Sequence, residues 1–269
     1  MIRLTGLRKS FRDRQGTTPV FDAINLDLPG GRRIGVIGDE GVGKSTLLKL
    51  LCGLEQPDGG SIDIDGRIAI PFGQNPGLTP TLSARENATF AARVFGLPIT
   101  EMVRKVEELA NLGAHFDREI GNYGRQQRLR LNVAILMAAN FEWYLVDDQF
   151  PITRARHSER LMLEFEALKK RSGLLIASTR SNLLREHCDS VIVLGDRSAV
   201  YYDDLEHGLK VYRDIAARPV RRRKGARKVD DSEDNTEALR SATQADKKEA
   251  RADRHKAPFT TNTQGFDAS

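Results

Sequence analysis

Short apolar runs alternate with longer amphipathic segments along most of the chain. Four early runs have the β-rich pattern of strands: IRLTGL (2–7), INLDL (24–28), RRIGVIG (32–38) and SIDIDGRIAI (61–70). Three later runs show no polar alternation: EWYLVDD (142–148), GLLIAST (173–179) and SVIVLGD (190–196). Continuous apolar runs of this length are typical of parallel strands that are buried on both faces.

Between the strands, apolar residues recur every three or four positions, which is the period of an amphipathic helix. STLLKLLCGL follows the strand at 32–38 in this way, and most of the segment from Leu82 to about Ala139 has the same spacing. The alternation of strands and helices predicts an α/β core, and the long helical stretch predicts an insertion within it. We expect one domain over residues 1–217, with a helical subdomain at about 75–139.

The segment 218–269 differs from the rest in composition. It carries 13 Lys or Arg and 9 Asp or Glu, and it is rich in Ala, Ser and Thr but poor in large apolar residues. Such a segment buries too little surface to offset its ordering entropy, so we expect a basic disordered tail. Its RPVRRRKGARK stretch is most simply interpreted as a solvated tail, and attraction to the anionic inner leaflet of a membrane is the second interpretation. No aromatic residues are interleaved for base stacking, and we expect no nucleic-acid partner.

Cysteine, histidine and hydropathy patterns exclude several classes. The two cysteines, Cys52 and Cys188, lie far apart, and the five histidines form no i, i+4 pair, so we expect neither a disulfide framework nor a zinc site. The start, MIRLTGLRKSF, lacks the apolar core of a signal peptide. The longest apolar runs are shorter than the roughly 20 residues needed to span a bilayer. A membrane role would therefore require a separate spanning chain.

The clearest chemical motif is GDEGVGKST, at 38–46, which satisfies G-x-x-x-x-G-K-[ST] between a predicted strand and a predicted helix. In such a loop the small residues let backbone N–H groups point at phosphates. The motif predicts a nucleotide site made of Gly38, Gly41, Gly43, Lys44, Ser45 and Thr46. Lys44 would reach the β- and γ-phosphates and the Ser45 hydroxyl would ligate Mg²⁺.

Two residues of this loop are acidic. Asp39 and Glu40 place negative charge beside the expected polyphosphate, which weakens binding unless a cation or a basic group compensates it.

About a hundred residues after the phosphate loop, the strand WYLV ends in Asp147 and Asp148. Asp147 is in the right place to hold Mg²⁺, the alternative being a simple strand-end cap. Asp148 would be a weakened general base, because it is one methylene shorter than the usual glutamate.

With these motifs placed, the chain resembles the ATP-binding subunits of ABC transporters, in particular those of bacterial exporters of capsular and related polysaccharide. The likeness runs from Ile2 to about Ile215 and includes GDEGVGKSTLLKLLCGLEQPDGGSI and TLSARENATFAARVFG. It implies a P-loop NTPase core of the RecA-like kind, an N-terminal antiparallel β subdomain and a helical insertion. It also implies ATP and Mg²⁺ as ligands, a membrane-spanning permease partner, and a homodimer or heterodimer of nucleotide-binding subunits. Such subunits are peripheral, at the cytoplasmic face of the inner membrane.

The resemblance adds further site residues. Phe11 lies 33 positions before Lys44, where the family places an aromatic residue that stacks on adenine; a core phenylalanine is the alternative. Gln74 matches the glutamine that touches Mg²⁺ and senses the membrane subunit, the alternative being an ordinary loop residue.

Four positions depart from the family pattern. The Ser-Gly-Gly signature, which closes on the partner's γ-phosphate, is YGRQQ here, so the residues acting in trans would be Gly124, Arg125, Gln126 and Gln127. Thr179 replaces the switch histidine, Asp148 the catalytic glutamate and Arg154 the aspartate of the next loop. Because each such group supports the transition state, their joint loss predicts binding without efficient turnover.

Arg154 and Glu40 deviate to opposite charges. In the family these loops meet across the dimer interface, which suggests an ion pair between subunits, although solvent-facing drift explains the two residues equally well. For the whole chain the leading hypothesis is an ATP-binding subunit of an exporter for capsular or related polysaccharide, whose ATP-dependent dimer closure drives or gates a separate membrane subunit. The alternatives are a pseudo-ATPase that completes an asymmetric complex with a competent partner, and a soluble ABC protein outside transport.

Overall fold

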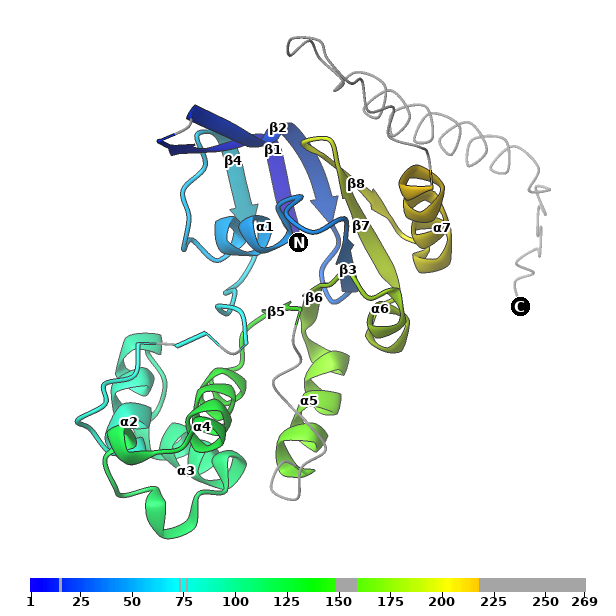
Figure 1. Cartoon of the computed structure of the whole chain (residues 1–269). Coiled ribbons are helices and arrows are strands. Elements are labelled where there is room, and N and C mark those ends of the chain that lie inside the picture. Colours follow the sequence, from blue (N-terminus) through cyan, green and yellow to red (C-terminus); the bar gives the residue numbers. More distant parts are fainter. Residues whose placement is uncertain (15, 73, 76, 149–158, 218–269) are drawn as a thin grey trace, which may run out of the picture. The chain divides into compact units, whose positions relative to one another are not determined.

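A computed structural model describes residues 1–217 of the chain, except 15, 73, 76 and 149–158. The N-terminal part is an antiparallel sheet of three strands in the order β2-β1-β4 (Figure 1). Its strands are β1 (Ile2–Asp13), β2 (Gly16–Leu28) and β4 (Gly59–Ile64). This sheet is the antiparallel β subdomain that the resemblance implied.

Alternation of side chains, interrupted once, gives β2 its buried face. Ile24, Leu26 and Leu28 are buried, while the residues between them are exposed. Phe21 lies three positions before Ile24 but is also buried, because the β1–β2 register shifts here and Ala23 has a φ of 54°. A bulge of this kind returns the next apolar side chain to the core face.

The second sheet has the order β5-β6-β3-β7-β8. Its strands are β3 (Arg33–Ile37), β5 (Trp143–Asp147), β6 (Gly173–Ala177), β7 (Ser190–Gly195) and β8 (Ser198–Tyr202). The first four in this order pair in parallel and are almost entirely buried. This confirms the expectation for β5, β6 and β7, whose apolar runs are unbroken. The last, β8, pairs antiparallel to β7 and was not predicted.

Four helices belong to this core: α1 (Lys44–Leu51), α5 (Glu159–Arg171), α6 (Ser181–His187) and α7 (Leu205–Ala216). The leucines of α1 are buried and join both sheets in one hydrophobic core, to which Trp143 of β5 also belongs. The α/β class is therefore confirmed.

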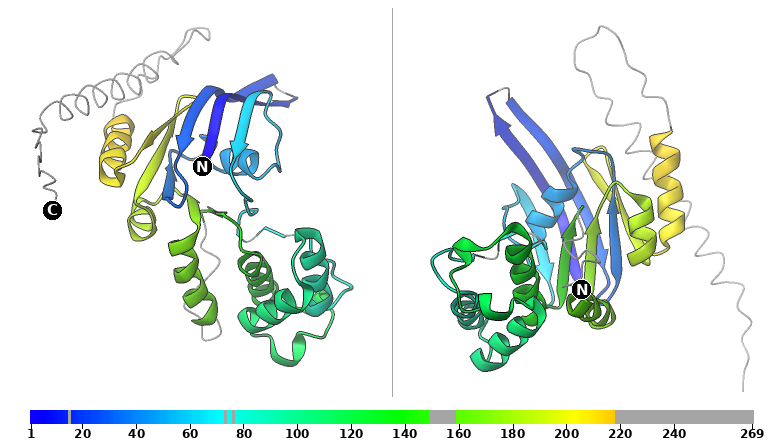
Figure 2. Two further views of the ribbon diagram at one scale, coloured as in Figure 1. Left: turned by 180° about the vertical axis from the view of Figure 1, so that it is seen from behind. Right: turned by 60° about the horizontal axis from the view of Figure 1, so that its bottom comes forward.

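A group of helices between β4 and β5 forms the predicted insertion (Figure 2). It consists of α2 (Ala84–Phe95), α3 (Ile99–Ala110), two short 3₁₀ turns and α4 (Arg125–Ala138). Ser83 and Glu86 cap α2 reciprocally, as the S-x-x-E spacing favours. Both α3 and α4 also contact α5, so the insertion packs on the core through that helix.

One predicted strand ends early. In SIDIDGRIAI the ladder stops at Ile64, because the chain turns at Gly66, where φ is 92° and an added Cβ would lie 2.7 Å from the Glu142 side chain. Beyond the turn, Ile68 makes an isolated parallel bridge to Trp143 instead. The expected basic tail, 218–269, and its boundary lie outside the described residues. Among the described helices, none combines the length and apolar character that crossing a bilayer requires.

Candidate functional site

The phosphate loop lies where β3 ends and α1 begins. Gly43 precedes α1 with a φ of 111°, and a Cβ at this position would come within 2.6 Å of Val20 Cγ1. Both the left-handed conformation and the close approach of β2 therefore require glycine here. Gly41 has a φ of 80°, so the loop also uses its second glycine for a turn that other residues rarely adopt.

Lys44 points into the loop formed by the preceding residues. Its Nζ donates to the carbonyl oxygens of Gly38 at 2.8 Å and Asp39 at 2.7 Å. Burial lowers the pKa of Lys44, while the nearby carboxylates of Asp148, Asp39, Asp147 and Glu40 oppose that shift. The ammonium is thus surrounded by carbonyls and acids that a bound phosphate would partly replace.

The sequence separates Ser45 and Asp147 by about a hundred positions, and the fold brings them into contact. Ser45, at the start of α1, donates its hydroxyl to Asp147 Oδ1 at 2.9 Å. Asp147 ends β5, which lies beside β6, and β6 in turn neighbours β3. Because these parallel strands end at the same edge of the sheet, the phosphate loop and the carboxylate meet there.

This pair suits Mg²⁺, which prefers oxygen ligands and keeps several waters and phosphate oxygens in its shell. A hydroxyl and one carboxylate are the kind of ligands that such a site takes from the protein. Over the described ranges, there is no group of three or more His, Cys, Asp or Glu that could enclose a metal by itself. The donor set therefore fits a magnesium ion held jointly with a nucleotide, and it does not fit a structural zinc site.

The register of β5 places Gln74 at the same edge. Phe72 bridges Val146 in parallel, and its N–H donates to Leu145 O at 2.9 Å. Gln74 follows Phe72 by two positions, in a turn where its N–H donates to Pro71 O at 3.1 Å, and its side chain is half-buried. The neighbourhood agrees with the predicted Mg²⁺ contact, which stays a prediction.

Asp148 is held differently from Asp147. It has a φ of 56°, which is uncommon for a residue other than glycine, and its N–H donates to Ala177 O at 2.8 Å. Its Oδ1 accepts a hydrogen bond from Ser178 Oγ at 3.1 Å. The carboxylate that would act as general base is thus directed to the residue that follows β6.

Sequence reasoning missed Ser178 and Arg180, which flank the exposed Thr179. The buried Ser178 hydroxyl accepts from Arg180 N–H at 3.1 Å, and Arg180 Nη2 donates to the Asp148 carbonyl oxygen at 2.8 Å. The run of polar residues directly after a buried strand was the available signal, because parallel strand ends share one edge. Two hydrogen-bonding side chains therefore support Asp148 where the family pattern has a histidine nearby.

Phe11 lies on β1 and is 40 % exposed, so it is not the core phenylalanine that was the alternative. The ammonium of Lys9 lies 4.9 Å from its ring centroid. Phe11 pairs with Thr18 of β2, the strand whose Val20 approaches Gly43. The exposure of this ring agrees with a stacking role, which stays a prediction.

The residues expected to act in trans begin α4. Gly124 caps this helix, and its N–H donates to Gln127 Oε1 at 3.0 Å. Arg125 and Gln126 are exposed. They belong to the helical insertion, whereas the phosphate loop lies between β3 and α1 (Figure 1). This separation within one chain is compatible with the expected action on a partner's nucleotide.

The proposed Glu40–Arg154 pair can be described only in part. Glu40 is exposed in the phosphate loop. Arg154 lies outside the described residues, so the contact between subunits stays a hypothesis.

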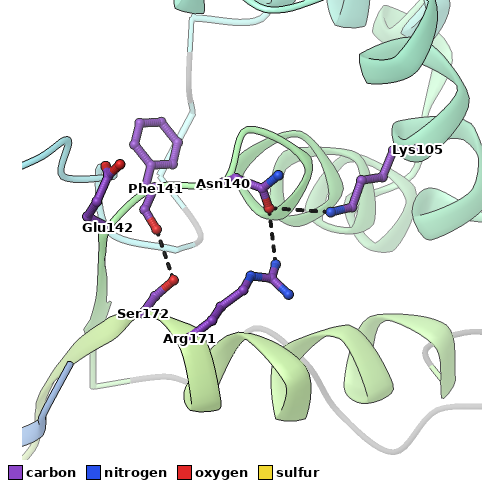
Figure 3. Close-up of a pocket in the computed structure, with 6 residues that line it drawn as sticks. All are labelled: Lys105, Asn140, Phe141, Glu142, Arg171 and Ser172. Carbon is purple, nitrogen blue, oxygen red and sulfur yellow. Dashed lines mark hydrogen bonds between the residues drawn. The ribbon is translucent and has the colours of Figure 1, made fainter.

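A pocket of about 450 Å³ lies near the other ends of β5 and β6, away from the phosphate loop (Figure 3). The Asn140 side chain accepts from Lys105 Nζ at 3.4 Å and from Arg171 Nη2 at 3.2 Å. Both cations also pair with Glu164, at 3.1 and 2.7 Å. Because these groups satisfy one another, we interpret the cluster as a contact that joins the insertion to α5 rather than as part of the nucleotide site.

Comparison with known proteins identifies a matching family model and relatives of this chain. A family model described as "ABC transporter" matches residues 21–150. The "Polysialic acid transport ATP-binding protein KpsT" of Escherichia coli is 35% identical over 221 residues, covering 80% of this chain and 99% of that protein. The "Capsule polysaccharide export ATP-binding protein CtrD" of Neisseria meningitidis serogroup B is 27% identical and covers 80% of this chain and 100% of that protein.

Solved structures show the same fold. A dimeric post-hydrolysis state of the ATP-binding cassette MJ0796, bound to ADP and Pi, aligns with a TM-score of 0.62 at 20% identity, covering 76% of this chain and 99% of that one. An ATP-binding subunit of an ABC transporter aligns with a TM-score of 0.64 at 19% identity, covering 81% and 95%. The chain therefore belongs to the ABC transporter family, as an ATP-binding subunit related to those of capsule polysaccharide exporters.

Proposed function

We propose that this chain is the nucleotide-binding subunit of an exporter for capsular or related cell-surface polysaccharide. The support is its similarity, over four fifths of its length, to proteins named for polysialic acid transport and capsule polysaccharide export. In this role it pairs with a second nucleotide-binding subunit and docks on a separate membrane-spanning permease, at the cytoplasmic face of the inner membrane. ATP-dependent closure of the pair drives or gates the permease.

The single observation that carries nucleotide binding is the contact between Ser45 and Asp147. These residues come from two motifs far apart in sequence, and their oxygens lie 2.9 Å apart. We assign Lys44 to the β- and γ-phosphates, Ser45 and Asp147 with Gln74 to Mg²⁺, and Phe11 to the adenine ring. When bound, Mg²⁺ would neutralise phosphate charge in a loop that also holds acids.

Hydrolysis requires a base that reaches the attacking water. Asp148 is shorter than glutamate by one methylene, and its Oδ1 already accepts the Ser178 hydroxyl. Thr179 supplies no imidazole for the γ-phosphate, and Gly124 supplies no hydroxyl from the partner. These features favour slow hydrolysis after normal binding, because small misplacements at a reacting centre cost large factors in rate.

A second candidate follows from the same observation. If Asp148 is not a competent base, the chain is a pseudo-ATPase that binds ATP and completes an asymmetric complex with a competent nucleotide-binding partner. A homodimer would then contain two sites that lack both the usual base and the usual signature, whereas in a heterodimer a competent partner would supply the base at one site and the signature at the other. The two functions share the binding step and differ in turnover.

The test is to measure Mg–ATP binding and ATP hydrolysis by the purified protein, alone and with its membrane subunit. We expect binding in both samples, with hydrolysis slow for the protein alone. Asp147→Asn should remove Mg²⁺-dependent binding, and Lys49→Ala, on the same helix as Lys44, should not. Rapid turnover by the protein alone that Asp148→Asn abolishes would contradict a weakened base. Failure to bind ATP in either sample would overturn the proposed function.

The basic segment from Arg218 supports a further, separate proposal, that it attracts the chain to anionic lipid. Cosedimentation with phosphatidylserine vesicles, compared with a chain ending at 217, would measure it. Equal cosedimentation of both chains would contradict this role.

A further inference from the structure

The second and third positions of the phosphate loop are acidic, and their charge opposes that of a triphosphate. Of the two acids, Asp39 is the more affected by this repulsion, because its own backbone carbonyl oxygen accepts a hydrogen bond from Lys44 Nζ at 2.7 Å. Its backbone therefore belongs to the surface that faces the phosphates. Two like charges a few ångströms apart repel strongly unless one is turned away or neutralised. The phosphate-loop motif alone does not explain how this acid is accommodated.

The Asp39 carboxylate accepts a hydrogen bond from a residue near the end of the described chain. Tyr212, on α7, donates its hydroxyl to Asp39 Oδ1 at 2.9 Å. Tyr212 is half-buried, and burial followed by the hydrogen bond to Asp39 raises the pKa of its hydroxyl to about 12. The hydroxyl therefore keeps its proton at physiological pH and remains a donor. The Asp39 carbonyl oxygen and the Asp39 carboxylate thus have different partners, Lys44 and Tyr212.

Tyr212 can reach the loop because α7 is seated closely on β7. A Cβ added to Gly208 of α7 would lie 2.2 Å from Val191 Cγ1 of that strand, so the helix cannot move closer or carry a larger residue there. Tyr212 follows Gly208 by four positions and so lies on the same face of the helix. This spacing directs its ring along β7.

The phosphate loop rests on the same strand. A Cβ added to Gly38 would lie 2.8 Å from Leu194 O, near the end of β7. Since both α7 and the start of the loop are packed against β7, their separation is set by a buried strand. The hydrogen bond between Tyr212 and Asp39 is therefore a contact between two fixed elements rather than a chance meeting of mobile side chains.

We propose that Tyr212 is a positioning residue of the nucleotide site, which holds the Asp39 carboxylate away from the phosphates and couples α7 to the phosphate loop. The proposal rests on the proposed function, because it concerns how ATP is bound. Without the hydroxyl, the carboxylate loses its partner on α7 and is free to rotate towards the loop. The resulting repulsion grows with the charge of the ligand, so ATP is affected more than AMP.

The test is a double-mutant cycle on nucleotide affinity, measured by titration calorimetry with Mg–ATP and with AMP. Tyr212→Phe should weaken ATP binding by up to about tenfold, because the restraint on the Asp39 carboxylate is worth no more than the hydrogen bond to a charged group that supplies it; AMP binding should weaken much less. Asp39→Asn removes the charge that Tyr212 controls, so Tyr212→Phe in that background should cost less than about twofold. Tyr201→Phe is the matched control, because the buried Tyr201 hydroxyl has no hydrogen-bond partner among the described residues.

A second readout does not need a ligand. Hydrogen exchange of amides 38–44 in the nucleotide-free protein should be faster in Tyr212→Phe than in Tyr201→Phe, because the loop loses one of its anchors. Unchanged ATP affinity and unchanged exchange in Tyr212→Phe would overturn the role of Tyr212 and leave the proposed function standing. A tenfold loss that persists in the Asp39→Asn background would also overturn it. If the unsubstituted protein binds no ATP, both proposals fall.

Discussion

The two adjacent acids at the end of β5 have different surroundings. Asp147 accepts a hydrogen bond from Ser45, a residue of an intact phosphate loop. Asp148 accepts one from Ser178, beside positions where the catalytic groups of the family are replaced. The geometry on the Asp147 side is that of a nucleotide-binding site, and the geometry on the Asp148 side is that of a carboxylate fixed in a protein hydrogen-bond network. We therefore expect nucleotide binding and hydrolysis to depend on neighbouring but separate sets of residues.

This difference shows why a motif match does not by itself establish turnover. Phosphate binding depends on backbone N–H groups, one lysine and oxygen ligands, which tolerate changes nearby. Hydrolysis depends on the placement of a base to within about 1 Å, and on donors from a second subunit. A chain can therefore keep the first set of residues while the second set changes. The predictions below separate the two sets.

The largest effect should come from the phosphate loop. Lys44→Ala removes the only loop ammonium among several carboxylates, and we expect ATP affinity to fall about 100-fold, the loss typical of charge-assisted hydrogen bonds to phosphate. Fluorescent-nucleotide titration measures this, with Lys49→Ala as the control on the same helix. If Lys44→Ala binds ATP normally, the loop does not hold the phosphates, and the separation of binding residues from hydrolysis residues fails.

Removing divalent metal should have the next largest effect. The carboxylates of Asp39, Glu40, Asp147 and Asp148 all lie near Lys44, so an uncomplexed triphosphate meets a net negative site. We expect chelation of Mg²⁺ with EDTA to weaken ATP binding roughly 30-fold. The same titration with adenosine, which carries no phosphate, should be insensitive to EDTA. Equal ATP affinity with and without metal would contradict the assignment of Ser45 and Asp147.

Restoring the length of the general base should change hydrolysis and leave ATP binding almost unchanged. Asp148→Glu moves the carboxylate by one methylene, and we expect hydrolysis to rise about tenfold while ATP affinity stays within about twofold. Asp148→Asn serves as the control of similar shape without a base. No rise in Asp148→Glu would show that the replaced histidine position, Thr179, or the partner's Gly124 limits the rate instead, which Thr179→His and Gly124→Ser added to Asp148→Glu would then resolve.

The smallest effect should come from Ser178→Ala. The substitution removes the hydroxyl that donates to Asp148 and accepts from the Arg180 N–H, so we expect a loss of about 1 kcal/mol in the free energy of unfolding. Nucleotide affinity should change by less than about twofold, because no hydrogen bond among the described residues joins Ser178 to the phosphate loop. Urea unfolding and ATP titration of the same sample measure both quantities. A large loss of ATP affinity would mean that Ser178 couples the surroundings of Asp148 to the nucleotide-binding residues.

Much of the fold followed from local pattern. Unbroken apolar runs such as GLLIAST indicated buried parallel strands, and the spacing of leucines indicated the helices, because burial on two faces or on one face leaves a periodic trace. β8 was missed because its five residues, SAVYY, are short and only partly buried. The early end of β4 was missed because it depends on the contact of Gly66 with Glu142, far along the chain.

The site was predictable to the extent that its residues form motifs. The loop Gly38–Thr46 and the acid Asp147 were singled out because they form motifs, and the structure brings Ser45 and Asp147 into contact. Tyr212 was not found, since a hydrogen bond across 173 positions leaves no pattern in the sequence. Ser178 and Arg180 were signalled only by a polar run after a buried strand, which does not show that they contact Asp148. Such contacts arise only when strand order brings distant segments to one edge.

The sequence by itself determined that this chain has an α/β core with a phosphate loop and a strand-end aspartate, because these features are local. The resemblance to the family then marked the catalytic positions at which this sequence differs. Only the tertiary structure decided what each acid faces. It placed Asp147 against Ser45, Asp148 against Ser178 and Asp39 against Tyr212. The physical reason is that local patterns follow from propensity and periodicity, whereas the partner of a charged side chain is set by the order of strands and the packing of helices upon them.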